Sequence, residues 1–409
     1  MEIKTQPKPI TKKTIVNISV IGVGGAGNNT LENIPKDKFP GIKFVYANTD
    51  KQVLEKYDPE FPLELNIGDE NDGLGAGADP KIGKFAAQNS IDEIRKILSR
   101  TRLLILTAGL GGGTGTGATP VIAKLAREMG ILTIAIVTTP FSIEGTKRIN
   151  NAQLGLEELK NNVDAYVVVS NDKLLNYYPD VAMIDAFQLV NNVLKNCIKA
   201  FTDLMLKTSL INLDFADLTA TIKDKGEAYI GFGMGVGQNK EIKAIESALN
   251  SKIIDTSIKG ANNIIINIIA DPSVSINQAT KIIEAFKQKI NNEADIIFGF
   301  DVDQNLKNEI HIAIIATKNK EINDQKEQIS NTNNPLSEQL LDINDEQQLH
   351  ETLIKIGNTL ELELSGKQPI VNDNYLETED LSFLTNEQED ENIFIEVDEN
   401  DDDIPFFLK

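Results

Sequence analysis

The chain has 409 residues, and its formal net charge of −21 comes almost entirely from residues 319–409, which contain 24 acidic residues and 5 lysines. Residues 1–318 are nearly neutral and lack a basic cluster, which argues against nucleic-acid binding, and the single cysteine, Cys197, excludes an intrachain disulfide. No apolar run approaches the roughly 20 residues of a membrane span, so we expect a cytoplasmic protein without nucleic-acid partners and without direct membrane insertion.

The first half of the chain alternates short β-branched runs with longer helical patterns. Near-continuous apolar strands that alternate with helices predict an α/β fold with a parallel sheet covered on both faces. The predicted strands are Thr14–Val23, Lys43–Ala47, Leu103–Leu106, Ile131–Val137 and Ala165–Val169, and the predicted helices are Pro80–Arg100, Thr116–Glu128 and Glu144–Asn161.

A long helix and a second, smaller α/β region follow. Apolar residues recur at helical spacing over Met183–Met205, and a shorter helix is predicted at Phe215–Lys223. After Lys318 the composition turns to Asn, Gln, Glu and Asp, which cannot bury enough apolar area to offset the entropy of ordering. The other predicted elements are the strands Tyr229–Met234, Asn263–Ile269, Ile296–Asp301 and Ile310–Thr317 and the helices Lys240–Asn250 and Ile276–Ile290.

A glycine-rich run, Gly22–Asn29, follows the first predicted strand and opens a helix. Glycines let the backbone approach a phosphate closely, and free N–H groups at a helix start attract it. The spacing Gly22-x-Gly24-x-x-Gly27 also fits a dinucleotide fingerprint, with Asp50 near the distance of a ribose-binding acid. A nicotinamide-dependent oxidoreductase and a nucleotide hydrolase therefore fit this segment equally well.

A second glycine-rich run, Gly109–Gly117, also lies between a strand and a helix. Three consecutive glycines are followed by alternating threonines and glycines, and ordering so many glycines costs backbone entropy, which argues against a purely structural role. Such a loop can surround an anion with N–H and hydroxyl donors. Two phosphate-binding loops at one edge of one sheet suit a triphosphate better than a dinucleotide. The chain has no G-x-x-x-x-G-K-[ST] motif, so it is not a P-loop enzyme.

The run Thr107–Gly117 resembles the phosphate loop of the tubulin/FtsZ family, and further motifs agree in order over residues 14–318. The resemblance implies a GTPase with GTP or GDP as ligand and an expected Mg²⁺ ion, for which no protein ligand is evident. Ser209, Thr139 and His311 depart from the family pattern and leave turnover rate and filament strength open. The other matching segments are Ala47–Asp50, Gly73–Pro80, Pro140–Gly145 with Arg148, Asn171–Leu175, Ile296–Gly299 and Ile314–Thr317.

The resemblance also implies a division of the chain and a set of nucleotide-binding residues. Glu144 and Arg148 are expected at the ribose and base, Asn191 at the guanine edge and Phe187 against the ring, although Phe187 also fits a core position and Glu144 with Arg148 an ordinary surface pair. The residues expected at the phosphates are Gly25, Ala26, Gly27, Asn28, Asn29, Gly113, Thr114 and Gly115. The expected regions are a flexible N-terminus (1–13), a GTP-binding domain (14–182), a central helix (183–206), a C-terminal domain (207–318), a disordered acidic linker (319–399) and a terminal peptide (400–409).

Carboxylates for hydrolysis occur together after the long helix, at Asp214 and Asp217. A helix of about 23 residues is roughly 35 Å long, so if Asn191 contacts the base, Asp214 cannot reach the γ-phosphate of the same subunit. The resemblance implies that Asn212, Asp214 and Asp217 complete a site on the next subunit of a head-to-tail filament. The alternative is that Asp214 only caps the following helix, which would make Asp217 the cleaner test.

The terminal run Asp401–Lys409 resembles the family's peptide for membrane-tethering adaptors; without the resemblance, a sticky terminus without a partner would be the preferred interpretation. The favoured function is a GTP-dependent polymer of the cell-division ring. The alternatives are a relative that assembles or regulates with little turnover and a nicotinamide-dependent oxidoreductase, which leaves Gly109–Gly117 and Asn212–Asp217 unexplained.

Overall fold

The computed structural model describes residues 16–34, 39, 41–57, 64–68, 73–179, 181–206, 210–211, 213–250, 254, 256–290 and 294–318. The predictions for residues 1–13, the acidic linker (319–399), the terminal peptide (400–409), Ser209 and Asn212 lie outside the described residues. Within the described helices, none combines the length and the hydropathy that a membrane span requires.

Six parallel strands form the first part of the sheet, in the order β3 (Glu64–Asn66), β2 (Ile42–Asn48), β1 (Ile18–Val23), β4 (Leu103–Gly109), β5 (Leu132–Thr139) and β6 (Ala165–Ser170). This order reverses between β1 and β4, and ligands of open α/β sheets bind where the order reverses, outside the carboxyl ends of the strands. The topology therefore places a binding crevice where β1 and β4 end, next to both glycine-rich runs.

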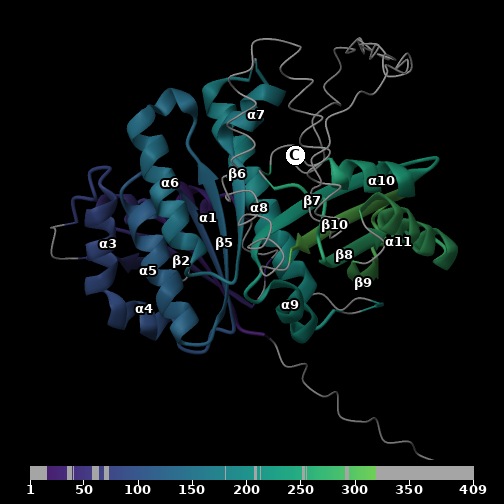
Figure 1. The fold of residues 1–409 in the computed structure, drawn as a ribbon, viewed down its shortest axis with the longest axis horizontal. Helices are drawn as coiled ribbons and strands as arrows, with labels where there is room; N and C mark the ends of the chain where they lie inside the picture. The colour runs from purple at the N-terminus through teal and green to yellow at the C-terminus, as the bar shows by residue number, and fades with distance from the viewer. Residues whose placement is uncertain are drawn as a thin grey trace, which may run out of the picture. The chain divides into compact units, whose positions relative to one another are not determined.

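Helices cover both faces of these strands, and alternate side chains of each strand point to opposite faces. In β4, for example, Leu103 and Ile105 lie in one buried cluster, whereas Leu104 and Leu106 lie in the other. The first face packs against α1 (Gly24–Glu32), α7 (Asn171–Tyr177) and α8 (Met183–Leu206), and the second against α3 (Pro80–Asn89), α4 (Ile91–Leu98), α5 (Thr114–Glu128) and α6 (Thr146–Lys160) (Figure 1).

The long helix α8 spans 24 residues, which corresponds to about 36 Å. Its residues Val190, Leu194, Cys197 and Phe201 are buried in the cluster that also contains Ile315 of the second domain. Burial raises the pKa of the Cys197 thiol to about 12, so this cysteine is a packing residue. The structure thus confirms the predicted long helix and shows that it packs against the sheet and the second domain together.

The second domain continues the same sheet. Only two residue pairs join β7 (Gly226–Val236) to β6, after which β10 (Glu309–Thr317), β8 (Asn263–Ala270) and β9 (Asp295–Val302) follow, with β10 antiparallel to both of its neighbours. Helices α9 (Phe215–Ile222), α10 (Lys240–Leu249) and α11 (Ile276–Ile290) belong to this region. A Cβ at Gly233 would lie 1.8 Å from the Ala244 carbonyl oxygen, so glycine lets α10 lie directly on β7.

The structure corrects the prediction of one helix at Pro80–Arg100. Two helices, α3 and α4, occupy this segment and meet at Ser90, whose hydroxyl accepts a hydrogen bond of 2.9 Å from the Gly68 backbone N–H. The buried serine ties this bend to the end of β3, a long-range contact that apolar periodicity does not contain. The short elements β3, α2 (Lys51–Leu54) and α7 were not predicted.

Candidate nucleotide-binding site

Helices α1 and α5, which follow β1 and β4, begin at the carboxyl end of the sheet without a capping side chain, and so does α6, which follows β5. Helix α1 starts at Gly24 and α5 at Thr114, and neither has an acidic residue in its first turn. The first N–H groups of a helix have no partner within the helix, and the helix dipole makes this end attractive to anions. By contrast, Asp79 caps α3 and Ser170 caps α7. The starts of α1 and α5 are therefore suited to bind a negatively charged ligand.

These two helix starts lie against each other. Gly24 has a φ of +71°, and a Cβ at this position would lie 2.9 Å from the Gly115 backbone nitrogen. A Cβ at Gly109 would lie 2.7 Å from the Ala26 Cβ. Both glycine-rich runs therefore form one surface at the ends of β1 and β4, where the strand order reverses.

The predicted phosphate-binding glycines and Gly112, which was not predicted, fall into two groups. A Cβ at Gly27 would lie 2.3 Å from the Thr107 carbonyl oxygen, and one at Gly113 would lie 2.7 Å from the Ala76 Cβ, so these two glycines allow close packing. At Gly25 and Gly112, by contrast, a Cβ would meet no atom within 4 Å. Both runs therefore contain a backbone position that faces open space, which leaves room for a ligand.

Asn28, also predicted at the phosphates, is buried and holds the framework of the site. Its amide donates to the Gly22 carbonyl oxygen at 2.8 Å and accepts from the Asn48 amide at 2.8 Å. The neighbouring Thr49 hydroxyl lies 2.6 Å from the Thr114 hydroxyl and links the end of β2 to the start of α5. The Asn28 side chain therefore joins the end of β1 to the end of β2 beneath the helix start.

Asp50, the ribose-binding acid of the dinucleotide interpretation, has a local role. Its carboxylate accepts a hydrogen bond of 3.2 Å from the Val53 backbone N–H and caps α2. Asx side chains at this position commonly cap helices. This weakens the nicotinamide alternative, although the strand order itself is that of dinucleotide-binding folds.

An aromatic and an amide side chain from α8 lie beside α1. Phe187 is 46% exposed and contacts Phe141 edge-to-face, with 5.3 Å between ring centroids. One turn later, the Asn191 Oδ1 accepts a hydrogen bond of 3.3 Å from the Thr30 hydroxyl. The alternative interpretation of Phe187 as a core residue is wrong, and the exposed ring is free to pack on a ligand.

Glu144 and Arg148 form the expected i,i+4 ion pair. The second Glu144 oxygen accepts a hydrogen bond of 2.9 Å from the Phe141 backbone N–H, which ties the pair to the aromatic contact with Phe187. The Arg148 side chain is half exposed. The pair is therefore both a surface ion pair and a part of the loop beside α8.

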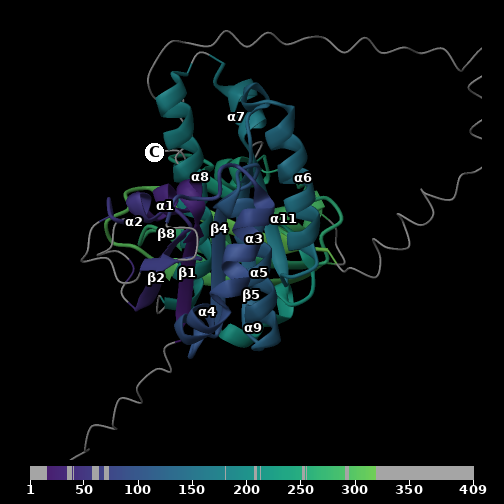
Figure 2. The same ribbon diagram turned by 90° about the vertical axis from the view of Figure 1, so that its left-hand side faces the viewer.

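The predicted hydrolytic carboxylates lie at the opposite end of the sheet. Asp214 caps α9, and Phe215 packs under the guanidinium of Arg102, which lies 4.9 Å from the ring centroid. Arg102 directly precedes β4, whose other end leads into Gly109–Gly117, and a strand of seven residues spans about 23 Å. Figure 2 shows α1 near the upper end of these strands and α9 at the lower end.

The capping interpretation of Asp214 is confirmed, and it extends to Asp217. The Asp217 N–H donates to Asp214 Oδ1 at 2.8 Å, and the Asp214 N–H donates to Asp217 Oδ2 at 2.9 Å. The idea that Asp217 offers a test free of capping effects is therefore wrong. Each carboxylate still has a second oxygen outside these two bonds, because the capping box uses one oxygen of each.

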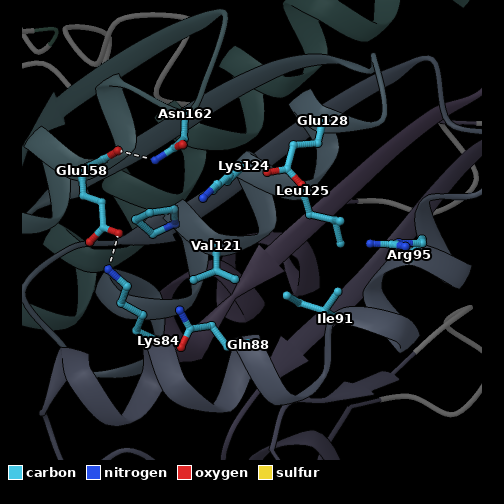
Figure 3. Close-up of a pocket in the computed structure, with 11 residues that line it drawn as sticks. Lys84, Gln88, Ile91, Arg95, Val121, Lys124, Leu125, Glu128, Glu158 and Asn162 are labelled. Carbon is cyan, nitrogen blue, oxygen red and sulfur yellow. Dashed lines mark hydrogen bonds and ion pairs between the residues drawn. The ribbon is translucent and has the colours of Figure 1, made fainter.

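Other features are separate from the nucleotide site. A pocket of about 280 Å³ lies among α3, α4, α5 and α6, and the Lys84–Glu158 ion pair of 2.6 Å lies at one side of it (Figure 3). None of the predicted site residues lines this pocket. Within the part of the chain that the structure describes, no three His, Cys, Asp or Glu side chains are grouped to hold a metal ion.

Sequence reasoning did not select three residues that complete the site, namely Phe141, Asn48 and Thr49. Phe141 supports the exposed ring of Phe187, and the other two residues join β2 to α1 and α5. All three lie inside segments that resemble the family, Ala47–Asp50 and Pro140–Gly145. Their position in these motifs was the available signal.

Comparisons with known proteins agree with this geometry. The family model for the tubulin/FtsZ GTPase domain matches residues 17–179, and the model for the FtsZ C-terminal domain matches residues 226–320. The cell division protein FtsZ of Mycoplasmopsis pulmonis is 38% identical over 396 residues, 96% of each chain. FtsZ 1 of Thermococcus kodakarensis is 40% identical over 317 residues, 77% of this chain and 84% of the relative.

Solved structures give the same result. A structure of an empty FtsZ dimer from M. jannaschii has a TM-score of 0.69 and 37% sequence identity, and covers 75% of this chain and 89% of that chain. The more distant CetZ1 of Haloferax volcanii, 20% identical with a TM-score of 0.64, shares the fold. The chain therefore belongs to the tubulin/FtsZ family and is a tubulin-like GTPase of the cell-division cytoskeleton, with a site for GTP and GDP.

Proposed function

We propose that this protein hydrolyses GTP between successive subunits of a head-to-tail filament. In this proposal one subunit binds GTP at the starts of α1 and α5, and Asn212, Asp214 and Asp217 of the next subunit complete the site. The observation that carries it is the separation of the two half-sites, since the glycine-rich runs and the α9 carboxylates lie at opposite ends of β4. Opposite ends of one molecule meet when copies stack in one direction.

Exposed apolar side chains at both ends support the same arrangement. Leu74, Ile143 and Ile184, in the segments around the nucleotide site, are 77%, 69% and 69% exposed. Leu210, shortly before α9, is 73% exposed, and its neighbour Ile211 is 44% exposed. Large exposed apolar residues that gather on a surface mark interaction sites. A head-to-tail contact would bury both sets, whereas a closed dimer with a single shared patch would bury one.

Each part of the nucleotide has a proposed binding group in the site described above. The free N–H groups of α1 and α5 would bind the phosphates, with Gly25, Ala26 and Thr114 at these two helix starts, and Asn29 in the second turn of α1 would contribute its side chain. The Asn191 Nδ2 would donate to the guanine edge, because its Oδ1 already accepts from Thr30. Phe187 would stack on the ring, and Arg148 would contact the ribose.

The hydrolytic step needs a positioned water molecule beside the γ-phosphate. The free oxygens of Asp214 and Asp217 from the next subunit would orient this water and accept its proton, giving GDP and phosphate. Mg²⁺ belongs to this proposal as an ion that neutralises charge on the phosphates. Because no three candidate ligands are grouped within the described residues, phosphate oxygens and water would hold it for the most part.

The first test is phosphate release from GTP with Mg²⁺ over a range of protein concentrations. We expect the rate per molecule to rise steeply above a threshold concentration, because a single subunit has half a site. Asp217→Asn keeps an oxygen that accepts the Asp214 N–H and should lower the rate about a hundredfold. Asp92→Asn, which removes a carboxylate from the first turn of α4, is the matched control and should leave the rate unchanged.

Two outcomes would contradict the proposal. A rate per molecule that stays constant down to the lowest concentration would mean that one subunit holds a complete site. Full activity of Asp217→Asn would remove this carboxylate from the reaction.

We also propose that the protein works at the division site through adaptors that bind residues 400–409. Acidic residues next to Ile404, Phe406, Phe407 and Leu408 suit capture by an apolar groove with basic edges. Deletion of residues 400–409 should leave phosphate release unchanged and abolish the location of a fluorescent fusion at midcell. A deleted chain that still forms midcell rings would refute this role of the terminal peptide.

A further inference from the structure

We propose that Arg102 is a positioning residue for hydrolysis, acting through the ring of Phe215 to orient the Asp214 and Asp217 carboxylates toward the neighbouring subunit. This inference rests on the proposed function and adds a residue that none of the sequence motifs described above contains. Arg102 belongs to the nucleotide-binding part of the chain, whereas the carboxylates belong to the second domain.

The contact itself is specific. The Arg102 guanidinium carbon lies 4.9 Å from the centroid of the Phe215 ring, a distance at which a cation is attracted to the face of an aromatic ring. No ion pair of Arg102 is found within the described residues. Phe215 is the first residue of α9 and directly follows the capping residue Asp214. The arginine therefore contacts the turn of α9 that presents the carboxylates.

The rest of α9 is held by other contacts. Leu218 and Ile222 are fully buried, and the Thr317 hydroxyl donates to the Thr221 carbonyl oxygen at 2.6 Å. These contacts fix the middle and the end of the helix. Directly before Asp214, Leu213 is buried in the main core cluster, and Phe215 packs in part against the same cluster. The Asp214 side chain itself is exposed. The ring contact with Arg102 adds a further restraint on Phe215, from the start of β4.

The direction of this first turn decides where the carboxylates point. The capping box orients Asp214 and Asp217 relative to each other, since each accepts from the other's backbone N–H. It does not orient the pair relative to the sheet. The buried Leu213 and the link from Phe215 to Arg102 do so together, and Arg102 is joined directly to the first residue of β4.

Strand β4 connects the two half-sites of one subunit. It begins after Arg102 and ends at Gly109, where the phosphate loop begins. The same strand thus carries the loop for the subunit's own GTP and the arginine that orients carboxylates for the neighbour's GTP. A pocket of about 320 Å³ lies beside the contact and is lined in part by Arg102, Phe215 and Thr219. On the side of this pocket, the guanidinium is not packed against other side chains.

The test compares Arg102→Met, which removes the cation and keeps an unbranched side chain, with Arg102→Lys, which keeps a cation for the ring. Phosphate release is measured in the full chain and divided by the amount of sedimented polymer. We expect Arg102→Met to lower this turnover roughly tenfold, since small misplacements of a reacting group are costly. Arg102→Lys should restore most of it. GTP affinity and the midpoint of thermal unfolding should stay unchanged in both variants.

A double-mutant cycle with Phe215→Leu separates positioning from direct action. If Arg102 acts through the ring, Phe215→Leu lowers turnover as much as Arg102→Met, and the double variant loses no more. Independent, multiplying losses would mean that Arg102 acts on the neighbour directly and would overturn the proposal. Normal turnover in Arg102→Met, together with a large loss in Asp217→Asn, would refute the role of Arg102 alone. Normal turnover in Asp217→Asn would refute the shared site itself.

Discussion

Helices start at both ends of the parallel sheet, and their first turns have opposite electrostatic character. At the carboxyl end, α1 and α5 start with glycines and threonines, without an acidic residue and without a capping side chain. At the amino end, α9 starts with a capping box made of two aspartates. The same helix dipole therefore attracts an anion from outside at one end and is satisfied by the chain's own carboxylates at the other.

At the start of another helix, α10, a buried ion pair involves the first residue of the helix. Lys240 is the first residue of α10, where the helix dipole disfavours a cation, and it is almost fully buried. An ion pair with the equally buried Asp271 offsets this charge. The starts of α4, α6 and α10 also lack a capping side chain, so a missing cap alone does not mark a ligand site. The starts of α1 and α5 differ because they meet where the strand order reverses and have no acidic residue in the first turn.

The largest expected effect comes from a carboxylate placed at the uncapped end. Gly112→Glu puts a negative charge into open space beside the start of α5, without a clash within 4 Å of its Cβ. We expect GTP to bind about a thousandfold more weakly, or about 4 kcal/mol, because like charges oppose each other there. Gly112→Ser is the neutral control and should bind within a few-fold of the parent chain. Equal binding by both variants, measured by nucleotide titration, would place the phosphates elsewhere.

A smaller effect, on the free energy of unfolding, is expected when low pH protonates Asp271 in its ion pair with Lys240 of α10. Burial raises the pKa of Asp271, but hydrogen bonds from Lys240 and Ser273 lower it to about 2, below the ordinary 3.8. A carboxyl group whose pKa is lower in the folded state than in the unfolded state stabilises the fold when the pH is above the unfolded-state pKa. This contribution of about 2 kcal/mol should therefore be lost as the pH falls from about 4 to about 2.

Chemical unfolding of the parent chain and of Asp271→Asn over this pH range measures the contribution. The variant should be less stable at pH 7, because its buried lysine lacks a charged partner, and the difference should shrink toward pH 2. A difference that is the same at both pH values would show that protonation of Asp271 does not control this pair.

The smallest expected effect separates capping from chemistry at α9. Asp214→Ala removes an acceptor for the Asp217 N–H and should lower the free energy of unfolding by about 1 kcal/mol. Asp214→Ser keeps a capping oxygen and should restore stability, but it lacks the carboxylate and should not restore phosphate release. Full phosphate release by Asp214→Ser would show that Asp214 acts as a cap alone.

Most of the fold could be predicted because its core elements carry strong local patterns. The apolar runs of β1, β4, β5 and β6 and the periodicity of α8 lie within a few residues of the predicted ranges. The break at Ser90 could not be predicted, because it depends on a hydrogen bond to Gly68 across 22 residues. Short elements such as β3 carry too few residues for a periodic signal.

The candidate site divides in the same way. Glycine composition and motif order identified both phosphate-binding runs, because ordering many glycines after a strand costs entropy and is therefore uncommon without a functional role. Composition could not show that Gly27 and Gly113 serve packing while Gly25 and Gly112 face open space. It also could not show that Asp217 shares the capping box, because a side-chain rotamer decides that contact.

The sequence by itself determined the order of the longer strands and helices, the two glycine-rich runs and the acidic pair at the start of α9, because each depends on residues close together in the chain. The tertiary structure decided which of these meet. Parallel strands place α1 and α5 at one end and α9 at the other, and Arg102 contacts Phe215 only because β4 starts beside α9. Local patterns fix what a segment is, whereas the pairing of distant strands fixes which segments share a surface.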